Sequence, residues 1–229
     1  RDFCLSRGLG DVYKRQLFDA EDCYGAWELY KAIRKQSPQT DLEIIMGPWH
    51  HGAWNGKGQS NLGNIDFGSQ TVLYYRNNIE YPFLQYHLNN IGSPTPASQK
   101  ATVFFSGKNE WKQFHAWPPT DTRPLSFYLG ENGTLNMCPP EKKESHSEYI
   151  SDPDKPVPYT DKTTYTRPKE YMTGDQRFSE RRPDVLSFKT EPLKESITLG
   201  GTIKAELEVA ITTTDADFVV KIIDEYPND

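Results

Sequence analysis

Apolar residues recur along the chain with two different periods, and the change of period predicts two parts of different fold. In residues 26–33 they fall at i, i+3, i+4 and i+7, which predicts a helix that Ser37-Pro38 ends. The largely apolar run of residues 42–46 predicts a buried strand. A second helical stripe spans residues 70–90, where Pro82 is expected to kink the helix or restart it. Strands and helices in succession over residues 17–97 indicate an α/β arrangement.

The pattern changes after a Pro/Ser linker at residues 92–97. Short β-rich runs separated by Pro, Gly and Asp turns predict an all-β sandwich or jelly roll over residues 98–229. The expected strands are residues 101–106, 125–129, 185–190, 202–212 and 218–223. Clean alternation in 203–211 is typical of a strand with one buried face, whereas the polar residues 141–173 are expected to cross the surface. The chain stops shortly after the last expected strand, so whether the sandwich is complete at residue 229 stays open.

Composition narrows the possible partners. Of the 229 residues, 35% are hydrophobic and 13% aromatic, which is enough apolar volume for packed cores. A net charge of −6 without a Lys/Arg-rich stretch argues against nucleic acid, and no window approaches the roughly 20 apolar residues of a membrane span. Cys4, Cys23 and Cys138 lack metal-ligand spacing and do not make a disulfide framework. The sequence therefore indicates no metal and no cofactor.

The first sixteen residues have a separate interpretation. Residues 11–16, Asp-Val-Tyr-Lys-Arg-Gln, are similar to the translation of a transposon-end adapter used in sequencing libraries, and residues 4–10 to the lead-in that accompanies it. Such segments are excluded from fold reasoning, so Leu17 is taken as the first residue of the protein proper. A genuine polar N-terminal loop is the alternative.

Two polar motifs follow the predicted strand ends. Asp19 comes after an apolar pair that reads as a strand end, and His50-His51 comes after the strand at 42–46. An acid and then a histidine in this context match the last two members of a Ser…Asp…His triad in an α/β-hydrolase, whose serine is expected upstream. Glu21 and Asp22 have two readings: they complement the dipole at a helix start, or they form a carboxylate cluster that attracts a substrate ammonium.

The same motifs resemble a known family. Asp-Ala-Glu-Asp-x-Tyr-Gly at 19–25 and Gly-Pro-Trp-x-His-Gly at 47–52 resemble the α-amino-acid ester hydrolases, which are grouped with the cocaine esterases, glutaryl-cephalosporin acylases and X-Pro dipeptidyl-peptidases. Residues 105–111, 117–119, 182–188 and 214–221 are similar to the C-terminal jelly roll of that group, a galactose-binding-like sandwich. The resemblance thus implies the C-terminal portion of an α/β-hydrolase domain at 17–97, followed by a jelly-roll domain at 98–229.

The resemblance also implies roles. Asp19 and His51 would be the triad acid and base, while Glu21 and Asp22 would bind the α-ammonium group of the substrate. The implied activity is a serine hydrolase that cleaves small esters, amides or short peptides with a free α-amino group through an acyl-enzyme, with water or an amine as acceptor. The whole protein is expected to form a homo-oligomer and to be periplasmic or secreted, and the 229 residues alone are expected to be inactive.

Rival functions stay open. An X-Pro dipeptidyl-peptidase or a glutaryl-cephalosporin-type acylase would share the triad and the jelly roll, and a non-catalytic carbohydrate-binding sandwich is the alternative from another class. Trp111 and Trp117 are interpreted as packing residues rather than as a sugar platform. The remaining histidines are interpreted as surface, packing or turn residues: His87, His115 and His146.

Overall fold

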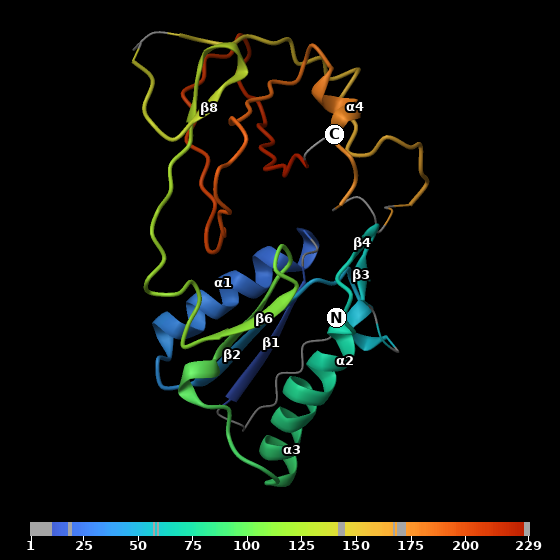
Figure 1. Cartoon of the computed structure of the whole chain (residues 1–229), viewed down its shortest axis with the longest axis vertical. Helices are drawn as coiled ribbons and strands as arrows, with labels where there is room; N and C mark the ends of the chain where they lie inside the picture. Colours follow the sequence, from blue (N-terminus) through green and yellow to red (C-terminus); the bar gives the residue numbers. More distant parts are fainter. Residues whose placement is uncertain are drawn as a thin grey trace. The chain divides into compact units, whose positions relative to one another are not determined.

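The structure is a computed structural model that describes residues 11–17, 20–56, 58, 60–141, 145–166, 168 and 173–226, with the backbone alone for 11–17 and 20–23 (Figure 1). The chain forms two compact units. Unit 1 comprises Arg1–Asp121 and Lys162–Gly174, and unit 2 comprises Thr122–Asp161 and Asp175–Asp229. Each unit is described by itself.

A four-stranded sheet organises unit 1, with strand order β1-β2-β5-β6. The strands are β1 (Asp11–Leu17), β2 (Asp41–Gly47), β5 (Ala101–Phe105) and β6 (Glu110–Phe114). β2 pairs in parallel with both β1 and β5, and β6 pairs antiparallel with β5. The predicted strand at 42–46 is confirmed as the centre of β2. Apart from Glu43 its residues are apolar, as expected for a strand that is covered on both faces.

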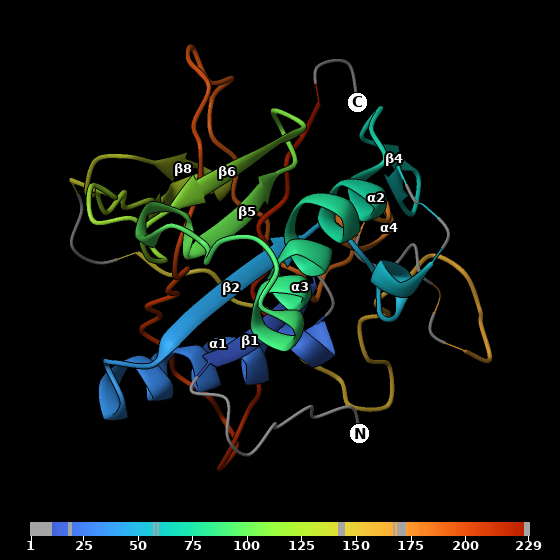
Figure 2. The ribbon, with the colours of Figure 1, turned by 90° about the horizontal axis from the view of Figure 1, so that it is seen from below.

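Helices cover the two faces of this sheet (Figure 2). Helix α1 (Ala20–Gln36) contributes Tyr30 to a cluster with Leu42 and Ile44 of β2. Residues of the opposite face of β2 point to a second cluster, in which Ile45 packs with Val72 and Tyr75 of α2 (Thr71–Tyr75). Alternate residues of β2 therefore support different helices, as the pleat of a strand requires.

The predicted helix at 70–90 is continuous but irregular. It consists of α2, a π-helical turn η2 (Arg76–Glu80) and α3 (Tyr81–Asn89), with Pro82 in the first turn of α3. Proline lacks an N–H and its ring crowds the carbonyl four residues earlier, so the regular bonding pattern changes just before it. Pro82 restarts the helix, as expected, and Asn90 ends it in a left-handed conformation with φ of 55°.

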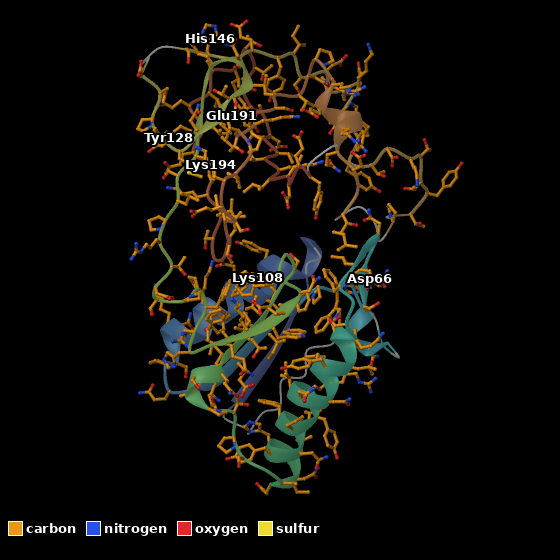
Figure 3. The ribbon with its side chains drawn as sticks, viewed as in Figure 1. Asp66, Lys108, Tyr128, His146, Glu191 and Lys194 are labelled. Atoms are coloured by element: carbon orange, nitrogen blue, oxygen red, sulfur yellow. The ribbon has the colours of Figure 1, made fainter. Side chains whose placement is uncertain are left out.

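Short elements complete unit 1. They are the 3-10 turn η1 (Ala53–Asn55), the hairpin strands β3 (Asn61–Leu62) and β4 (Ile65–Asp66), and the 3-10 turn η3 (Ala97–Gln99). Asp66 accepts a hydrogen bond from the amide of Gly68 at 2.9 Å, which closes the turn that follows β4 (Figure 3).

Unit 2 has little regular structure among its described residues. It contains β7 (Tyr128–Leu129), paired antiparallel with β8 (Leu135–Asn136), the turn η4 (Glu131–Gly133) and helix α4 (Arg177–Glu180). A single parallel bridge joins Thr134 to Lys189. Lys189 also binds Glu180 at 2.7 Å and Glu225 at 2.9 Å, so one side chain links α4 to the C-terminal segment.

The β-rich runs of unit 2 are shorter than predicted. The expected strand at 125–129 is reduced to β7, that at 185–190 to the bridge at Lys189, and neither 202–212 nor 218–223 is assigned as a strand in the part of the chain that the structure describes. Ile203 and Val219, for example, are 68% and 83% exposed. An alternating sequence becomes a strand only where another segment supplies hydrogen-bonding partners, and sequence pattern alone does not show where such a partner lies.

The division into units differs from the predicted boundary between residues 97 and 98. Residues 101–103 of β5 pair with 44–46 of β2, which carries the chain as far as Asp121 in unit 1. This pairing joins residues far apart in the sequence, so local composition did not indicate it. Residues 11–16 lie in β1, where their backbone pairs with β2. Every sequence carries backbone N–H and C=O groups that can pair in a sheet, so this pairing does not distinguish an adapter-derived segment from a natural one. The adapter interpretation of residues 1–16 stays a prediction.

Candidate active site

The candidate site is built on the carboxyl ends of two adjacent parallel strands. Leu17, the last residue of β1, is the partner of Gly47, the last residue of β2. The two strands therefore end at the same edge of the sheet, which is where open α/β sheets place functional loops. Asp19 comes two residues after this edge but lies outside the described residues, while His51 follows four residues after Gly47.

The two candidate ammonium-binding acids lie at the start of α1. The backbone places Glu21 and Asp22 in the first turn of this helix, which begins at Ala20. Carboxylates at this position complement the positive end of the helix dipole, by about 0.3–1 kcal/mol at an exposed site. The same position puts both residues directly after the end of β1, so the structure leaves their two predicted readings open.

Trp49 anchors the loop that carries His51. Its side chain is fully buried, and the indole Nε1–H donates to the Thr71 hydroxyl at 3.0 Å. The ring packs against Tyr75 and Trp111, with centroid separations of 5.0 and 5.8 Å. Gly47 leaves room for it, since a Cβ there would lie 2.3 Å from the Trp49 ring. Gly47 and Trp49 of the motif therefore have a packing role, because they hold the loop against the sheet edge.

His51 lies at the exposed side of this loop. Its ring is 6.0 Å from that of Trp54, in an edge-to-face orientation. Gly52 follows with φ of 79°, a left-handed conformation that glycine adopts without strain, and the amide of Ala53 donates back to the carbonyl of His50 at 3.1 Å. The neighbouring His50 is half-buried. Of the two adjacent histidines, His51 is thus the more exposed.

A cluster of charged residues around the buried Glu43 lies at the opposite end of β2. Lys100 bonds to Asp41 and approaches the Glu43 carboxylate at 3.3 Å. Burial raises the pKa of Glu43, against the opposing effects of the Thr95 hydrogen bond and the Lys100 charge. Burial lowers the pKa of Lys100, but its bonds to Asp41 and Glu43 outweigh this and raise it. This cluster links the residue before β5 to the first residues of β2. The His51 loop follows the other end of β2.

The other histidines singled out in the sequence, and Trp111 and Trp117, make packing or polar contacts. The His87 ring packs 4.3 Å from that of Phe83, and a ring nitrogen of His115 lies 2.9 Å from the Ala97 carbonyl. His146 lies exposed, 3.1 Å from Glu148 (Figure 3). Trp111 and Trp117 belong to aromatic clusters of unit 1, which confirms their interpretation as packing residues.

The described ranges contain neither a cluster of metal-ligating side chains nor a helix suited to cross a membrane. Within them no three His, Cys, Asp or Glu side chains are grouped so that they could hold a metal ion. None of the helices described is both long enough and apolar enough to traverse a bilayer.

The family of the chain follows from a match that covers more than half of it. Residues 89–228 match the X-Pro dipeptidyl-peptidase C-terminal non-catalytic domain. The chain belongs to the X-Pro dipeptidyl-peptidase-like family. The matched domain is the C-terminal β-sandwich of this family, and the family also includes the cocaine esterases and α-amino-acid ester hydrolases of the predicted resemblance.

Individual relatives match further upstream as well. The cocaine esterase of Rhodococcus sp. (strain MB1 Bresler) is 28% identical over 196 residues, which are 82% of this chain and 34% of the esterase. An α-amino acid ester hydrolase structure is 32% identical with a TM-score of 0.72, over 82% of this chain and 32% of the hydrolase. An aminopeptidase from the marine sediment archaeon Thaumarchaeota archaeon is 31% identical with a TM-score of 0.70, over 78% and 30%. The chain thus spans about a third of the length of these relatives.

Sequence reasoning missed three residues that shape the His51 loop. Thr71 is the acceptor for Trp49, Trp54 contacts the His51 ring, and Arg76 donates to the Gly56 carbonyl at 3.2 Å. Thr71 and Arg76 are more than 15 residues away from the motif and carry no local signal. Trp54 had one available signal, since it follows His51 by three residues within a glycine-containing turn.

Proposed function

We propose that the whole protein is a serine hydrolase of the X-Pro dipeptidyl-peptidase-like family that cleaves esters or amides of acyl groups with a free α-amino group. The observation that carries this proposal is the level ending of β1 and β2, with Leu17 opposite Gly47, since Asp19 and His51 follow these two ends. Likeness to a cocaine esterase and an α-amino acid ester hydrolase supports hydrolysis as the reaction. In this proposal residues 17–97 are the C-terminal portion of an α/β-hydrolase domain and 98–229 a jelly roll that braces it.

The proposed mechanism gives each residue one task. His51 accepts the proton of a serine hydroxyl supplied by the preceding part of the protein, as that oxygen attacks the acyl carbon. Asp19 orients the imidazole and stabilises its positive charge. His51 then protonates the leaving alcohol or amine, which leaves an acyl-enzyme. In the second half His51 takes a proton from water, or from an acceptor amine, and returns one to the serine as the acyl product departs.

Glu21 and Asp22 account for the preference for an α-amino group in this proposal. Two carboxylates next to the end of β1 attract an ammonium more strongly than a neutral group, and the attraction grows where water is excluded. The assignment requires that both residues follow the end of β1 directly, and their place in the first turn of α1 meets this requirement. A des-amino substrate would lack the attraction and would also leave the carboxylates without their cationic partner.

The test begins with the coding sequence upstream of Leu17, where we expect a Gly-x-Ser-x-Gly turn after a strand. In the protein expressed with that sequence, His51→Ala should lower kcat by at least ~10³-fold, in the range typical of triad removal. His50→Ala is the matched control and should retain most of the activity. The reverse result would assign the base to His50, and full activity in both variants would refute the triad.

Substrate preference is tested separately. Glu21→Gln and Asp22→Asn should each reduce kcat/KM for α-amino esters and leave that for matched des-amino esters nearly unchanged. Equal rates for both ester classes in the unmodified protein would refute the α-amino proposal but leave the hydrolase intact. The family match also favours an X-Pro dipeptidyl-peptidase as second candidate. Release of a chromophore from X-Pro amides faster than from α-amino esters would favour that candidate.

A further inference from the structure

Burial does not fix the orientation of the His51 imidazole. The residue is exposed, and glycine follows it at position 52. An exposed side chain next to a glycine samples several rotamers unless a neighbour restricts it. Trp54 is such a neighbour, because its ring lies 6.0 Å from the imidazole with an angle of 75° between the planes. This is the edge-to-face arrangement that aromatic pairs prefer.

Trp54 is itself held from two sides. It belongs to η1, where the amide of Asn55 donates to Gly52 at 3.2 Å and the amide of Gly56 to Ala53 at 3.0 Å. Its half-buried side chain packs against the core cluster that contains Trp49. The backbone of Trp54 thus lies in a hydrogen-bonded turn, and its side chain contacts the core as well as His51.

The π-helical turn η2 secures the end of η1. Arg76, its first residue, donates from Nη1 to the Gly56 carbonyl at 3.2 Å. A π-helical turn shifts the following side chains relative to a regular helix and is often found at functional sites. The Tyr75 hydroxyl lies 3.2 Å from the Glu80 carboxylate across the same turn. η2 and the end of η1 are therefore joined through one charge-assisted hydrogen bond, whose acceptor Gly56 follows Trp54 by two residues.

We propose that Trp54 is a positioning residue that restricts the ring orientation of His51, in addition to the orienting role proposed for Asp19, and that Arg76 supports Trp54 through Gly56. Restriction of an imidazole to one orientation keeps its nitrogen aimed at the reacting proton, and misplacement of a catalytic group by ~1 Å costs on the order of 10²-fold in rate. The contact between His51 and Trp54 lies within this chain, so it can be measured without the upstream part of the protein. Its consequence for catalysis rests on the proposed hydrolase function.

The orientation is measured in the 229-residue chain with imidazole NMR at one fixed pH. The His51 resonances are assigned with His51→Gln, and those of His115 serve as an internal control from another part of unit 1. Trp54→Leu should remove the ring-current shift of the His51 imidazole protons and broaden or average their signals. Trp54→Phe should retain a shift of the same sign, because a smaller aromatic ring remains. Unchanged His51 resonances in Trp54→Leu would overturn the proposal.

Arg76→Met keeps the proposal testable if Trp54→Leu fails to fold, because this exposed side chain contributes little to the core. It should move the His51 resonances in the same direction as Trp54→Leu, by a smaller amount, and leave those of His115 in place. Equal movement of both histidines would indicate a general loss of structure and would refute a specific role for Arg76.

The catalytic consequence is separated from the proposed function by a second measurement. In the protein expressed with its upstream sequence, Trp54→Leu should lower kcat about 10- to 100-fold with KM changed less than about threefold, and Trp54→Phe should restore most of kcat. If His51→Ala and His50→Ala are both fully active, the hydrolase proposal fails while the NMR result stands. If His51→Ala is inactive but Trp54→Leu has unchanged kcat, the positioning role fails and the hydrolase proposal stands.

Discussion

Replacement of Gly47 by alanine tests whether the His51 loop is held by the packing of Trp49. The new Cβ would lie 2.3, 2.4 and 2.5 Å from three carbons of the Trp49 ring, whereas ordinary contacts begin at about 3.4 Å. The ring is fully buried and bound to Thr71, so it cannot turn away without breaking that hydrogen bond. The strand must move by several tenths of an ångström at least, or the indole must leave its site.

The expected cost follows from overpacking of a dense core, which destabilises by about 1–3 kcal/mol. Alanine also lowers the entropy of the unfolded chain, which offsets ~0.4–1 kcal/mol. Gly47→Ala should therefore reduce the free energy of unfolding of unit 1 by about 1–2 kcal/mol. Gly25→Ala is the matched control: this exposed glycine lies within α1, and its Cβ would meet nothing within 4 Å. It should instead stabilise by about 0.5–1 kcal/mol.

Urea unfolding followed by tryptophan fluorescence measures both changes in unit 1 alone, because all five tryptophans precede Asp121. The midpoint should fall for Gly47→Ala and rise for Gly25→Ala with the same slope. A midpoint for Gly47→Ala at or above that of the unmodified chain would refute the packing role of Gly47. A fall of equal size in both variants would show that the method does not resolve the contact.

Three further predictions concern single interactions. Thr71→Val leaves the buried Trp49 N–H without its acceptor and should cost about 1–3 kcal/mol in the same urea assay, whereas Thr71→Ser should cost much less; equal values would refute the bond. Burial raises the pKa of Glu43 in the folded chain above its value of 4.5 in the unfolded chain. At pH values between these two pKa values the folded chain binds more protons than the unfolded chain. The contribution of Glu43 to stability therefore falls as pH rises from about 4.5. Glu43→Gln should remove that slope between pH 4 and 8, and an unchanged slope would contradict the assignment. Arg182 binds Asp184 through two contacts of 2.6 and 2.8 Å and lowers its pKa, so this pair should weaken as pH falls below about 4. Arg182→Lys should speed proteolysis next to Lys155, whose carbonyl Arg182 also binds at 3.0 Å, and unchanged cleavage would refute the link.

Much of unit 1 could be predicted from the sequence because its elements have local causes. The apolar run at 42–46 became β2, the stripe at 26–33 became the centre of α1, and Pro82 restarted the second helix. The motif around His51 was visible for the same reason, since it directly follows a strand. The location of Asp19 after β1 could be predicted too, although that residue lies outside the described ranges and its role stays a prediction.

The sequence by itself determined which segments of unit 1 are helical or extended and which polar residues follow strand ends, because these depend on neighbours within about ten positions. Only the tertiary structure decided that β5 pairs with β2, that Thr71 receives the Trp49 hydrogen bond, and that Trp54 and Arg76 surround the His51 loop. It also decided that 202–212 and 218–223 lie without an assigned strand among the described residues, despite their alternating or β-rich pattern. The physical reason is common to these cases: pairing and packing join residues distant in sequence, and local pattern states what a segment can form but not which partner it meets.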